Sequence, residues 1–425
     1  MNTAPALSDV LVRSARLVAH VARGRSLATR PADLDFGDPG VMRGAVMDVT
    51  YSTLRRYGRG DALINALARR GVSDLEVRAL LLCTLSAIET ARYAEHVAVD
   101  QAVRACASLR KPGAKSFVNA LLRGFLRERS ALEKRLTTDR VASAMHPAWW
   151  IDRLHAAYPQ DWEAILQAGN EHPPMGLRVN RRRVGAAEYV DRLQQHGMPA
   201  RHVRGVAVLL ERPVRVDQLP GFGEGEVSVQ DPGAQRAAEY LDLADGQRVL
   251  DACAAPGGKT GHILEIADVD LLALDSDPLR CRRVSENLTR LALRAHVVAA
   301  DCAKPEQWWD GSPFDRILAD VPCTASGIAR RNPDIKWLRR AGDSARFSRD
   351  QARILDGLWR VLAQGGKLLY VTCSVFPEEN AAVVEAFCAR QPDARRLGLP
   401  QNEQAQLLPG TEHDGFFYAL LQKHI

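Results

Sequence analysis

Apolar residues recur at helical spacing through most of residues 8–140. The run 77–88 is apolar enough to form a central buried helix, and the run 115–127 sets an apolar stripe opposite several arginines. Breaking and capping residues, such as Lys111-Pro112-Gly113, separate these runs. The pattern predicts an all-α domain over residues 1–140, and no catalytic set of side chains stands out in it.

Residues 141–225 mix helical and strand-like patterns and are rich in chain-breaking residues. Two short strand-like runs, at 175–180 and 205–210, flank a helical run at 185–197. We expect this part of the chain to be a small α+β insert that guides the substrate.

From residue 226 the pattern changes to a repeated order of strand, loop and helix. Amphipathic runs at 277–291 and 349–363 predict helices. Short apolar runs predict strands at 248–252, 269–274, 296–300, 316–319, 367–372 and 416–421. This alternation is typical of a doubly wound, mostly parallel sheet with helices on both faces, so we expect a Rossmann-like α/β domain over 226–425.

The bulk composition describes an ordinary globular protein, with 46% hydrophobic and 25% charged residues in 425. The start of the chain lacks the pattern of a signal peptide, and no apolar run is long enough to cross a membrane. The eight cysteines show neither paired spacing nor zinc-ligand spacing. We therefore expect a cytoplasmic monomer without a disulfide framework, a structural metal or a membrane partner.

Charge is distributed unevenly along the chain. Residues 1–150 carry 23 Lys and Arg against 14 Asp and Glu, whereas the remaining residues carry 34 against 37. A basic N-terminal part beside a near-neutral remainder favours a module that faces nucleic acid. The alternative is a merely solvated surface, in which the preference for arginine reflects composition.

The first strand of the α/β domain runs into a loop of small residues that opens a helix. Its members are Cys253, Ala254, Ala255, Pro256, Gly257, Gly258 and Lys259. Such a loop lets the backbone approach a ligand closely. A phosphate-binding P-loop needs glycine where Cys253 stands, and the dinucleotide fingerprint is missing too. The loop therefore predicts a nucleoside-type cofactor without a diphosphate.

Three consecutive predicted strands end in a carboxylate, namely Asp251, Asp275 and Asp301. One such acid is most often a helix cap, but three in register argue against that explanation. Carboxylates repel phosphate but suit ribose hydroxyls, amines and a sulfonium. This pattern points to S-adenosylmethionine as the cofactor.

Two further strands are followed by cysteines, Cys323 and Cys373. A cysteine in apolar surroundings is usually an inert buried residue. Two thiols at the carboxyl edge of one sheet, however, suggest a covalent mechanism that needs two sulfurs, since a thiolate is a strong nucleophile.

These motifs resemble those of the Sun/Nop2-type RNA cytosine-5 methyltransferases, in the branch that acts on bacterial small-subunit rRNA. The resemblance rests on the segments 228–232, 251–260, 320–323, 330–337, 372–375, 377–380 and 414–419, and it covers nearly the whole chain. Residues 8–135 look like the NusB-type RNA-binding domain of this branch.

The resemblance implies methyl transfer from S-adenosylmethionine to C5 of a cytidine, cytidine 967 of 16S rRNA, through a covalent bond between cysteine and C6. It implies that Cys373 is the nucleophile and that Cys323 serves enzyme release. Sequence chemistry alone would have favoured Cys323, because DNA cytosine-5 enzymes use a Pro-Cys nucleophile. Two alternatives stay open, namely another RNA as substrate and an inactive rRNA-binding assembly factor.

Other side chains are expected to assist. Asp320 would hydrogen-bond the cytosine edge or contact the cofactor, as the family places it, and Lys259 would orient the base or neutralise nearby carboxylates. A cluster that combines charge with an aromatic face predicts contact with unpaired RNA; it consists of Arg330, Arg331, Lys336 and Trp337. The alternative for this cluster is a salt-bridged surface loop.

Overall fold

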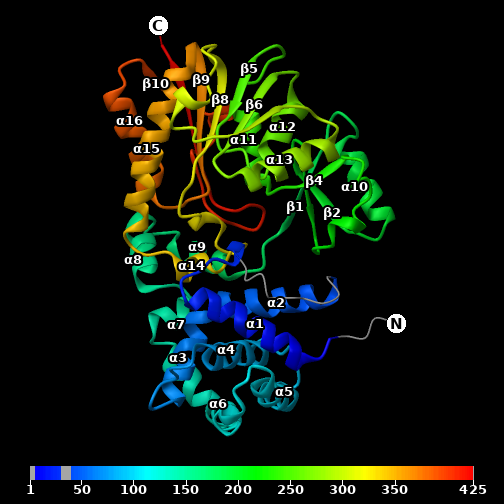
Figure 1. Ribbon diagram of the computed structural model, residues 1–425, viewed down its shortest axis with the longest axis vertical. Helices are drawn as coiled ribbons and strands as arrows, with labels where there is room; N and C mark the ends of the chain where they lie inside the picture. The colour runs from blue at the N-terminus through cyan, green and yellow to red at the C-terminus, as the bar shows by residue number, and fades with distance from the viewer. Residues whose placement is uncertain (1–4, 30–39, 425) are drawn as a thin grey trace. The chain divides into compact units, whose positions relative to one another are not determined.

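The computed structural model describes residues 5–29 and 40–424. They form two compact units, drawn in Figure 1. The helical unit comprises the chain up to Glu171 together with Ala329–Ala341, and the sheet unit comprises His172–Ile328 and Gly342–Ile425.

This division differs in two ways from the expected segments. Residues 141–171 belong with the helical unit, and the strands of the expected insert belong with the sheet unit. Residues 329–341, expected in the α/β domain, pack in the helical unit instead. The expected division of the chain into the segments 1–140, 141–225 and 226–425 stays a prediction.

The helical unit is built from α-helices (Figure 1). They are α1 (Leu7–Ala22), α2 (Val41–Arg55), α3 (Tyr57–Leu67), α4 (Leu75–Glu89), α5 (Glu95–Ser108), α6 (Lys115–Leu136), α7 (Arg140–Ala144), α8 (Ala148–Ala157), α9 (Trp162–Asn170) and α14 (Ile335–Leu338).

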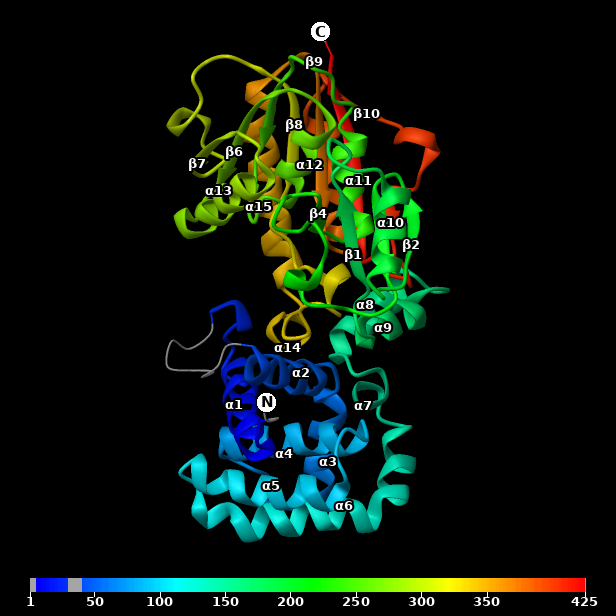
Figure 2. The same cartoon turned by 90° about the vertical axis from the view of Figure 1, so that its right-hand side faces the viewer.

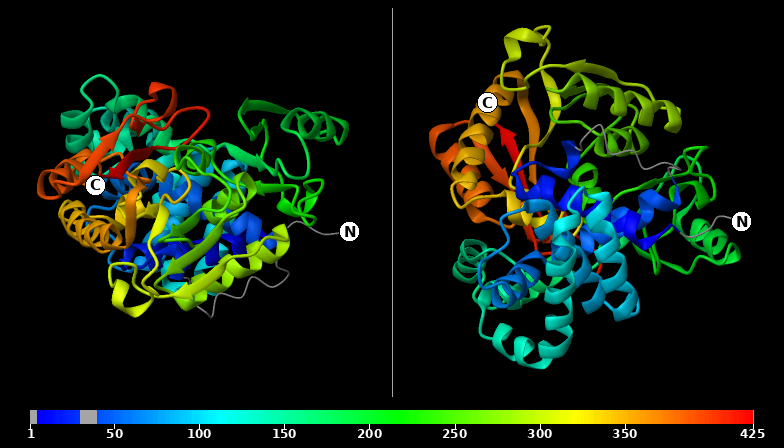
Figure 3. Two further views of the ribbon diagram at one scale, coloured as in Figure 1. Left: turned by 90° about the horizontal axis from the view of Figure 1, so that it is seen from above. Right: turned by 60° about the horizontal axis from the view of Figure 1, so that its bottom comes forward.

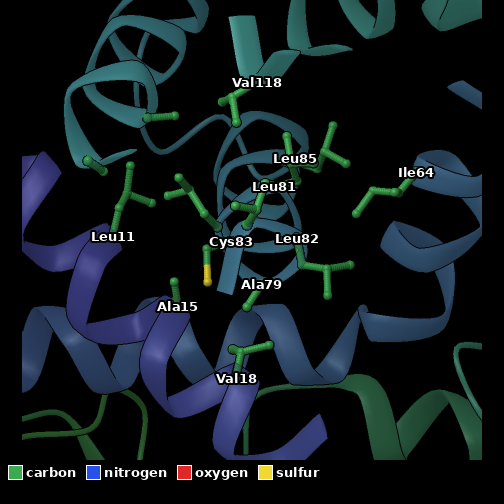
Figure 4. Close-up of a cluster of buried hydrophobic side chains, with 14 of the residues drawn as sticks. Leu11, Ala15, Val18, Ile64, Ala79, Leu81, Leu82, Cys83, Leu85 and Val118 are labelled. Atoms are coloured by element: carbon green, nitrogen blue, oxygen red, sulfur yellow. The ribbon is translucent and has the colours of Figure 1, made fainter. Parts of the chain in front are cut away.

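Helix α4 lies at the centre of this unit, as its apolar sequence predicts. Asp74 caps its start by accepting hydrogen bonds from the N–H groups of Glu76 and Val77. Figure 4 shows Leu81 and Cys83 of α4 among side chains from neighbouring helices. Full burial of one such leucine contributes about 1.5–3 kcal/mol, so packing holds this unit together.

The sheet unit is built around an eight-stranded sheet in the order β10-β12-β9-β8-β5-β6-β7, with β11 paired to β12. The strands are β5 (Arg248–Asp251), β6 (Asp270–Asp275), β7 (His296–Ala299), β8 (Phe314–Asp320), β9 (Leu362–Thr372), β10 (Ala394–Leu397), β11 (Gln406–Leu407) and β12 (Phe416–Lys423). Strands β5 to β9 are parallel, and β12 runs antiparallel beside β9. Figure 3 shows the C-terminal strand, in red, beside a strand drawn in orange.

Helices cover both faces of this sheet (Figure 1). They are α11 (Pro232–Tyr240), α12 (Gly258–Ile266), α13 (Pro278–Leu291), α15 (Asp343–Val361) and α16 (Ala381–Arg390). Side chains alternate between the faces, because Val249 packs with α11, α12 and α13 whereas Leu250 packs with α15 and α16. The doubly wound α/β arrangement that the sequence predicts is present.

A second, antiparallel sheet precedes the large one, with the strand order β2-β3-β1-β4. Its elements are β1 (Met175–Val179), α10 (Ala186–Gln195), β2 (Ala200–Arg204), β3 (Ala207–Leu210) and β4 (Val227–Val229). Tyr189 and Leu193 of α10 pack on this sheet. Figure 2 shows α10 beside β1 and β2. The sequence predicted β1, α10 and β3, but β2 and β4 are too polar or too short to stand out.

Candidate active site

Two cysteines meet at the carboxyl ends of neighbouring strands. In the parallel pair β8 and β9, Asp320 lies opposite Val371. The chain continues three residues to Cys323 and two residues to Cys373. The two Sγ atoms are consequently 3.4 Å apart. The expectation that both thiols lie at one edge of the sheet is met by this geometry.

The two thiols differ in their surroundings. Cys323 is buried and Cys373 is half-buried. The hydrogen bond with Cys373, together with burial, raises the pKa of Cys323 well above its ordinary value. Cys323 is therefore a protonated thiol at neutral pH, and Cys373 is the more accessible sulfur.

An ion pair lies at the same edge of the sheet. Lys259, in the first turn of α12, donates to Asp320 at the end of β8, with an Nζ–Oδ2 distance of 2.6 Å. Burial by itself lowers the pKa of Lys259, but the neighbouring groups, Asp320 foremost among them, together outweigh this and raise it above its ordinary value. Cys373 contributes in the same direction, so the lysine is a fixed positive charge near that sulfur.

The small-residue loop between β5 and α12 is held in one conformation by two features. Gly257 has a φ of +94°, and a Cβ there would come within 3.1 Å of the Cα of Val284, so only glycine fits. The backbone N–H of Ala255 donates to Asp275 at 3.2 Å. The acid at the end of β6 therefore anchors the loop.

A cavity of about 310 Å³ opens beside this loop, at the carboxyl ends of β5 to β8. It is lined by Ala252, Cys253, Asp275, Ser276, Arg280, Ala300, Asp301, Cys302, Pro322, Asp350, Arg353 and Ile354. Its volume falls in the range of small-ligand sites, and its place is where open α/β sheets bind ligands. Asp275 and Asp301 offer carboxylates to hydroxyl or amine groups, which fits a nucleoside cofactor without a diphosphate.

Asp251, the third predicted acid, lies behind this loop and is fully buried. Its Oδ2 accepts a hydrogen bond from the Thr260 hydroxyl at 2.7 Å, whereas its Oδ1 has no hydrogen-bond partner among the described residues. Burial raises the pKa of Asp251 to about 7. This acid supports the loop from within and does not line the cavity.

Sequence reasoning missed a buried arginine that braces the loop. Arg178 of β1 pairs with Glu265 of α12 through two hydrogen bonds of 2.8 and 2.7 Å. It also donates to Gln230 at 2.6 Å and to the backbone oxygen of Gly258. An arginine within an apolar strand was the only signal of it in the sequence.

The predicted RNA-binding cluster requires a correction. Arg330 and Lys336 are buried in the helical unit. Lys336 Nζ donates to the backbone oxygens of Arg55 and Met145, both at 3.0 Å, and to Oδ1 of Asn170 at 2.7 Å. Because three oxygens use all of its donors, Lys336 acts as an internal brace and does not offer its charge to RNA.

The neighbouring aromatic residue has a similar structural role. Trp337 donates to the backbone oxygen of Leu54 at 2.7 Å, and its ring lies 5.0 Å from that of Tyr57. The half-buried indole therefore fastens α14 to the helical unit. Arg331 is half-buried, and its contact with RNA stays a prediction.

Three family models match the chain: the NusB family at residues 10–127, the ferredoxin-like domain of RsmF/B-like methyltransferases at 146–217, and the 16S rRNA methyltransferase RsmB/F at 238–422. "Ribosomal RNA small subunit methyltransferase B" of Vibrio cholerae is 43% identical over 385 residues, which cover 89% of each chain. The protein of the same name from Pseudomonas putida is 44% identical and covers 96% of this chain and 97% of its own.

The chain belongs to the RsmB/F family of 16S rRNA methyltransferases. The resemblance inferred from the motifs is thereby confirmed, and so is a NusB-type helical domain before a Rossmann-like methyltransferase domain. The solved structure of PH0851 has the same fold, with a TM-score of 0.79 at 24% identity over 97% of this chain and 99% of that one.

No group of three or more His, Cys, Asp or Glu side chains within 5–29 and 40–424 is arranged to hold a metal ion. None of the helices that the structure describes has both the length and the apolar character needed to cross a bilayer.

Proposed function

We propose that this chain methylates C5 of a cytidine in 16S rRNA, at position 967, with S-adenosylmethionine as methyl donor. The observation that carries the proposal is the pair of thiols, with their Sγ atoms 3.4 Å apart at the ends of adjacent strands. Pro322, the residue before Cys323, lines the cavity that fits a nucleoside cofactor. The thiols and the cofactor site are thus neighbours along one edge of the sheet.

In this proposal Cys373 is the nucleophile. Its thiolate adds to C6 of the cytosine ring, which forms an S–C6 bond and places electron density on C5. When bound, S-adenosylmethionine supplies a methyl group as an electrophilic carbon. After C5 has been methylated, a base takes the C5 proton, and the electron pair of that C–H bond re-forms the C5–C6 double bond as the S–C6 bond breaks and the Cys373 thiolate leaves.

The surrounding residues support these steps. Lys259, whose positive charge is held by Asp320, lies near Cys373 and can orient the base there. Asp320, held by Lys259, can face either the base or the cofactor. Cys323 lies within contact of Cys373 and keeps its proton at neutral pH, so we assign it to the release of the product.

The test is incubation of the full chain with labelled S-adenosylmethionine and 16S rRNA, followed by nucleoside analysis. We expect 5-methylcytidine, and mapping should place it at position 967 in wild-type cells and not in cells that lack this protein. 5-Methylcytidine only in tRNA or 23S rRNA would contradict the substrate, and no methylated nucleoside at all would contradict the enzymatic role.

A further inference from the structure

Two adjacent residues, Glu379 and Asn380, each hold one of the two cysteine loops. Neither takes part in the chemistry described above. Both are buried, in the short connection between β9 and α16. A buried carboxylate and a buried amide are costly unless they are hydrogen-bonded, so their partners show what they are for.

Glu379 holds the loop that carries Cys323. Its carboxylate accepts two hydrogen bonds from Thr324, the next residue in the chain, one from the backbone N–H at 2.6 Å and one from the hydroxyl at 2.7 Å. The backbone oxygen of Glu379 in turn accepts from the Tyr370 hydroxyl at 2.6 Å. The Glu379 carboxylate thus holds the residue that follows Cys323, and Tyr370 of β9 holds Glu379 itself.

Asn380 holds the loop that carries Cys373. Its Oδ1 accepts from the Thr372 hydroxyl at 2.6 Å, and its Nδ2 donates to the backbone oxygen of Ser374 at 2.9 Å. These two partners are the residues immediately before and after Cys373. The amide therefore spans the nucleophile without touching its sulfur.

The two loops are also joined directly to each other. Ser326 and Ser374 share a hydrogen bond of 3.0 Å between their hydroxyls, and the N–H of Gly327 donates to the backbone oxygen of Cys373 at 2.9 Å. A shift of either loop would consequently change the distance between the two sulfurs.

We propose that Glu379 and Asn380 are positioning residues with different tasks: Glu379 holds Cys323 for product release, and Asn380 holds Cys373 for attack on C6. This inference rests on the proposed function. The charge of Glu379 adds to the causes that raise the pKa of Cys323, after the hydrogen bond with Cys373 and burial, which agrees with a release thiol that keeps its proton. A misplacement of about 1 Å can cost up to about 100-fold in rate.

The test uses the full chain, 16S rRNA and S-adenosylmethionine, with samples denatured at successive times. Two quantities are measured: the fraction of protein linked to RNA and the amount of 5-methylcytidine. In Glu379→Gln the amide oxygen can still accept from the Thr324 N–H, but the amide nitrogen then faces the Thr324 hydroxyl, which must turn and can no longer donate to residue 379. We expect release to slow by about 10- to 100-fold, so that RNA-linked protein accumulates above the wild-type level.

Asn380→Asp should slow the formation of RNA-linked protein instead of its release. It retains the acceptor for Thr372 but loses the donor to Ser374, and it sets an anionic oxygen against that carbonyl. We expect adduct and product to form more slowly by about the same factor, without accumulation of linked protein.

Matched variants separate positioning from general loss of structure. Glu378→Gln changes the exposed neighbouring carboxylate and should leave both quantities at wild-type values. Thr324→Val removes the hydroxyl bonded to Glu379 and should accumulate linked protein, whereas Thr324→Ser keeps that hydroxyl and should not. If the melting temperature shows that Glu379→Gln does not fold, Thr324→Val and Thr324→Ser still test whether Glu379 holds the loop of Cys323.

The outcomes are distinct. The inference is wrong if Glu379→Gln or Thr324→Val lowers RNA-linked protein and 5-methylcytidine in parallel. It is also wrong if either variant shows the wild-type fraction of RNA-linked protein. A wild-type protein that forms neither adduct nor 5-methylcytidine overturns the proposed function, and this inference with it.

Discussion

Lys259 is half-buried and Lys336 is fully buried, and both were expected to be functional, yet their partners differ. Lys259 faces the carboxylate of Asp320, which raises its pKa above the ordinary value. Lys336 faces three neutral oxygens, and burial lowers its pKa well below the ordinary value. The charge of the partner therefore distinguishes Lys259, in the candidate active site, from Lys336, which braces the helical unit.

The largest effect should follow from removal of the proposed nucleophile beside Lys259. We expect Cys373→Ala to lower the rate of 5-methylcytidine formation by at least about 1,000-fold, because no other group supplies the S–C6 bond. Cys388→Ala, which alters a half-buried cysteine of α16, is the matched control and should retain wild-type activity. Similar losses in both variants would show that the effect is structural.

The second prediction concerns the carboxylate behind the loop of Lys259. The pKa of Asp251 is about 7 in the folded state, whereas its ordinary value is 3.8. Between pH 3.8 and pH 7 the folded protein therefore keeps a proton on Asp251 that the unfolded chain has lost. Stability on this account falls as the pH rises from 3.8 to 7, by on the order of 3–4 kcal/mol. Asp251→Asn should remove this loss.

The measurement for Asp251→Asn is chemical denaturation of variant and wild type at several values between pH 4 and pH 8. The difference in free energy of unfolding, variant minus wild type, should grow up to about pH 7 and stay constant above it. A difference independent of pH would contradict a raised pKa of Asp251.

The third prediction compares the same substitution, lysine to methionine, at Lys259 and at Lys336. Lys259→Met should lower methyl transfer by about 100-fold, because the charge beside Asp320 and Cys373 is lost. Lys336→Met leaves three buried oxygens without a donor and should lower the free energy of unfolding of the helical unit by about 1–3 kcal/mol, with little change in kcat. Calorimetry and the nucleoside assay measure both, and a reversed pattern would overturn the distinction between the two lysines.

The smallest effect tests how closely α14 packs against α3 of the helical unit. A methyl group on Gly58 would lie 2.8 Å from Trp337 Cη2 and 3.0 Å from the backbone oxygen of Val141. We expect Gly58→Ala to destabilise the helical unit by about 1–2 kcal/mol. Gly44→Ala, in α2 with open space around it, should be neutral or stabilising in the same melting experiment.

The sequence was sufficient to predict that the two cysteines lie at one edge of the sheet. Strand periodicity placed Cys323 and Cys373 after two strands of a mostly parallel sheet, and parallel strands bring their carboxyl ends to one edge. That these two strands are neighbours is a finding of the structure. The same reasoning predicted the loop from Cys253 to Lys259 and the acid Asp275 at the end of the next strand.

Other contacts depend on which unit a segment packs against, and local pattern does not carry that information. Residues 329–341 follow the loop of Cys323 in sequence but pack in the helical unit, so Lys336, which was expected to contact RNA, is buried there. The motif that contains Glu379 and Asn380 was recognised, but their tasks depend on contacts with Thr324 and Thr372 that only the folded chain defines.

The most direct test of the central claim, that Cys373 attacks and Cys323 releases, is a denaturing gel of Cys323→Ala mixed with 16S rRNA and S-adenosylmethionine. We predict an RNA-linked band that accumulates in this variant and disappears when Cys373→Ala is added to it. Accumulation of the band in Cys373→Ala, with none in Cys323→Ala, would contradict the account and exchange the roles of the two sulfurs.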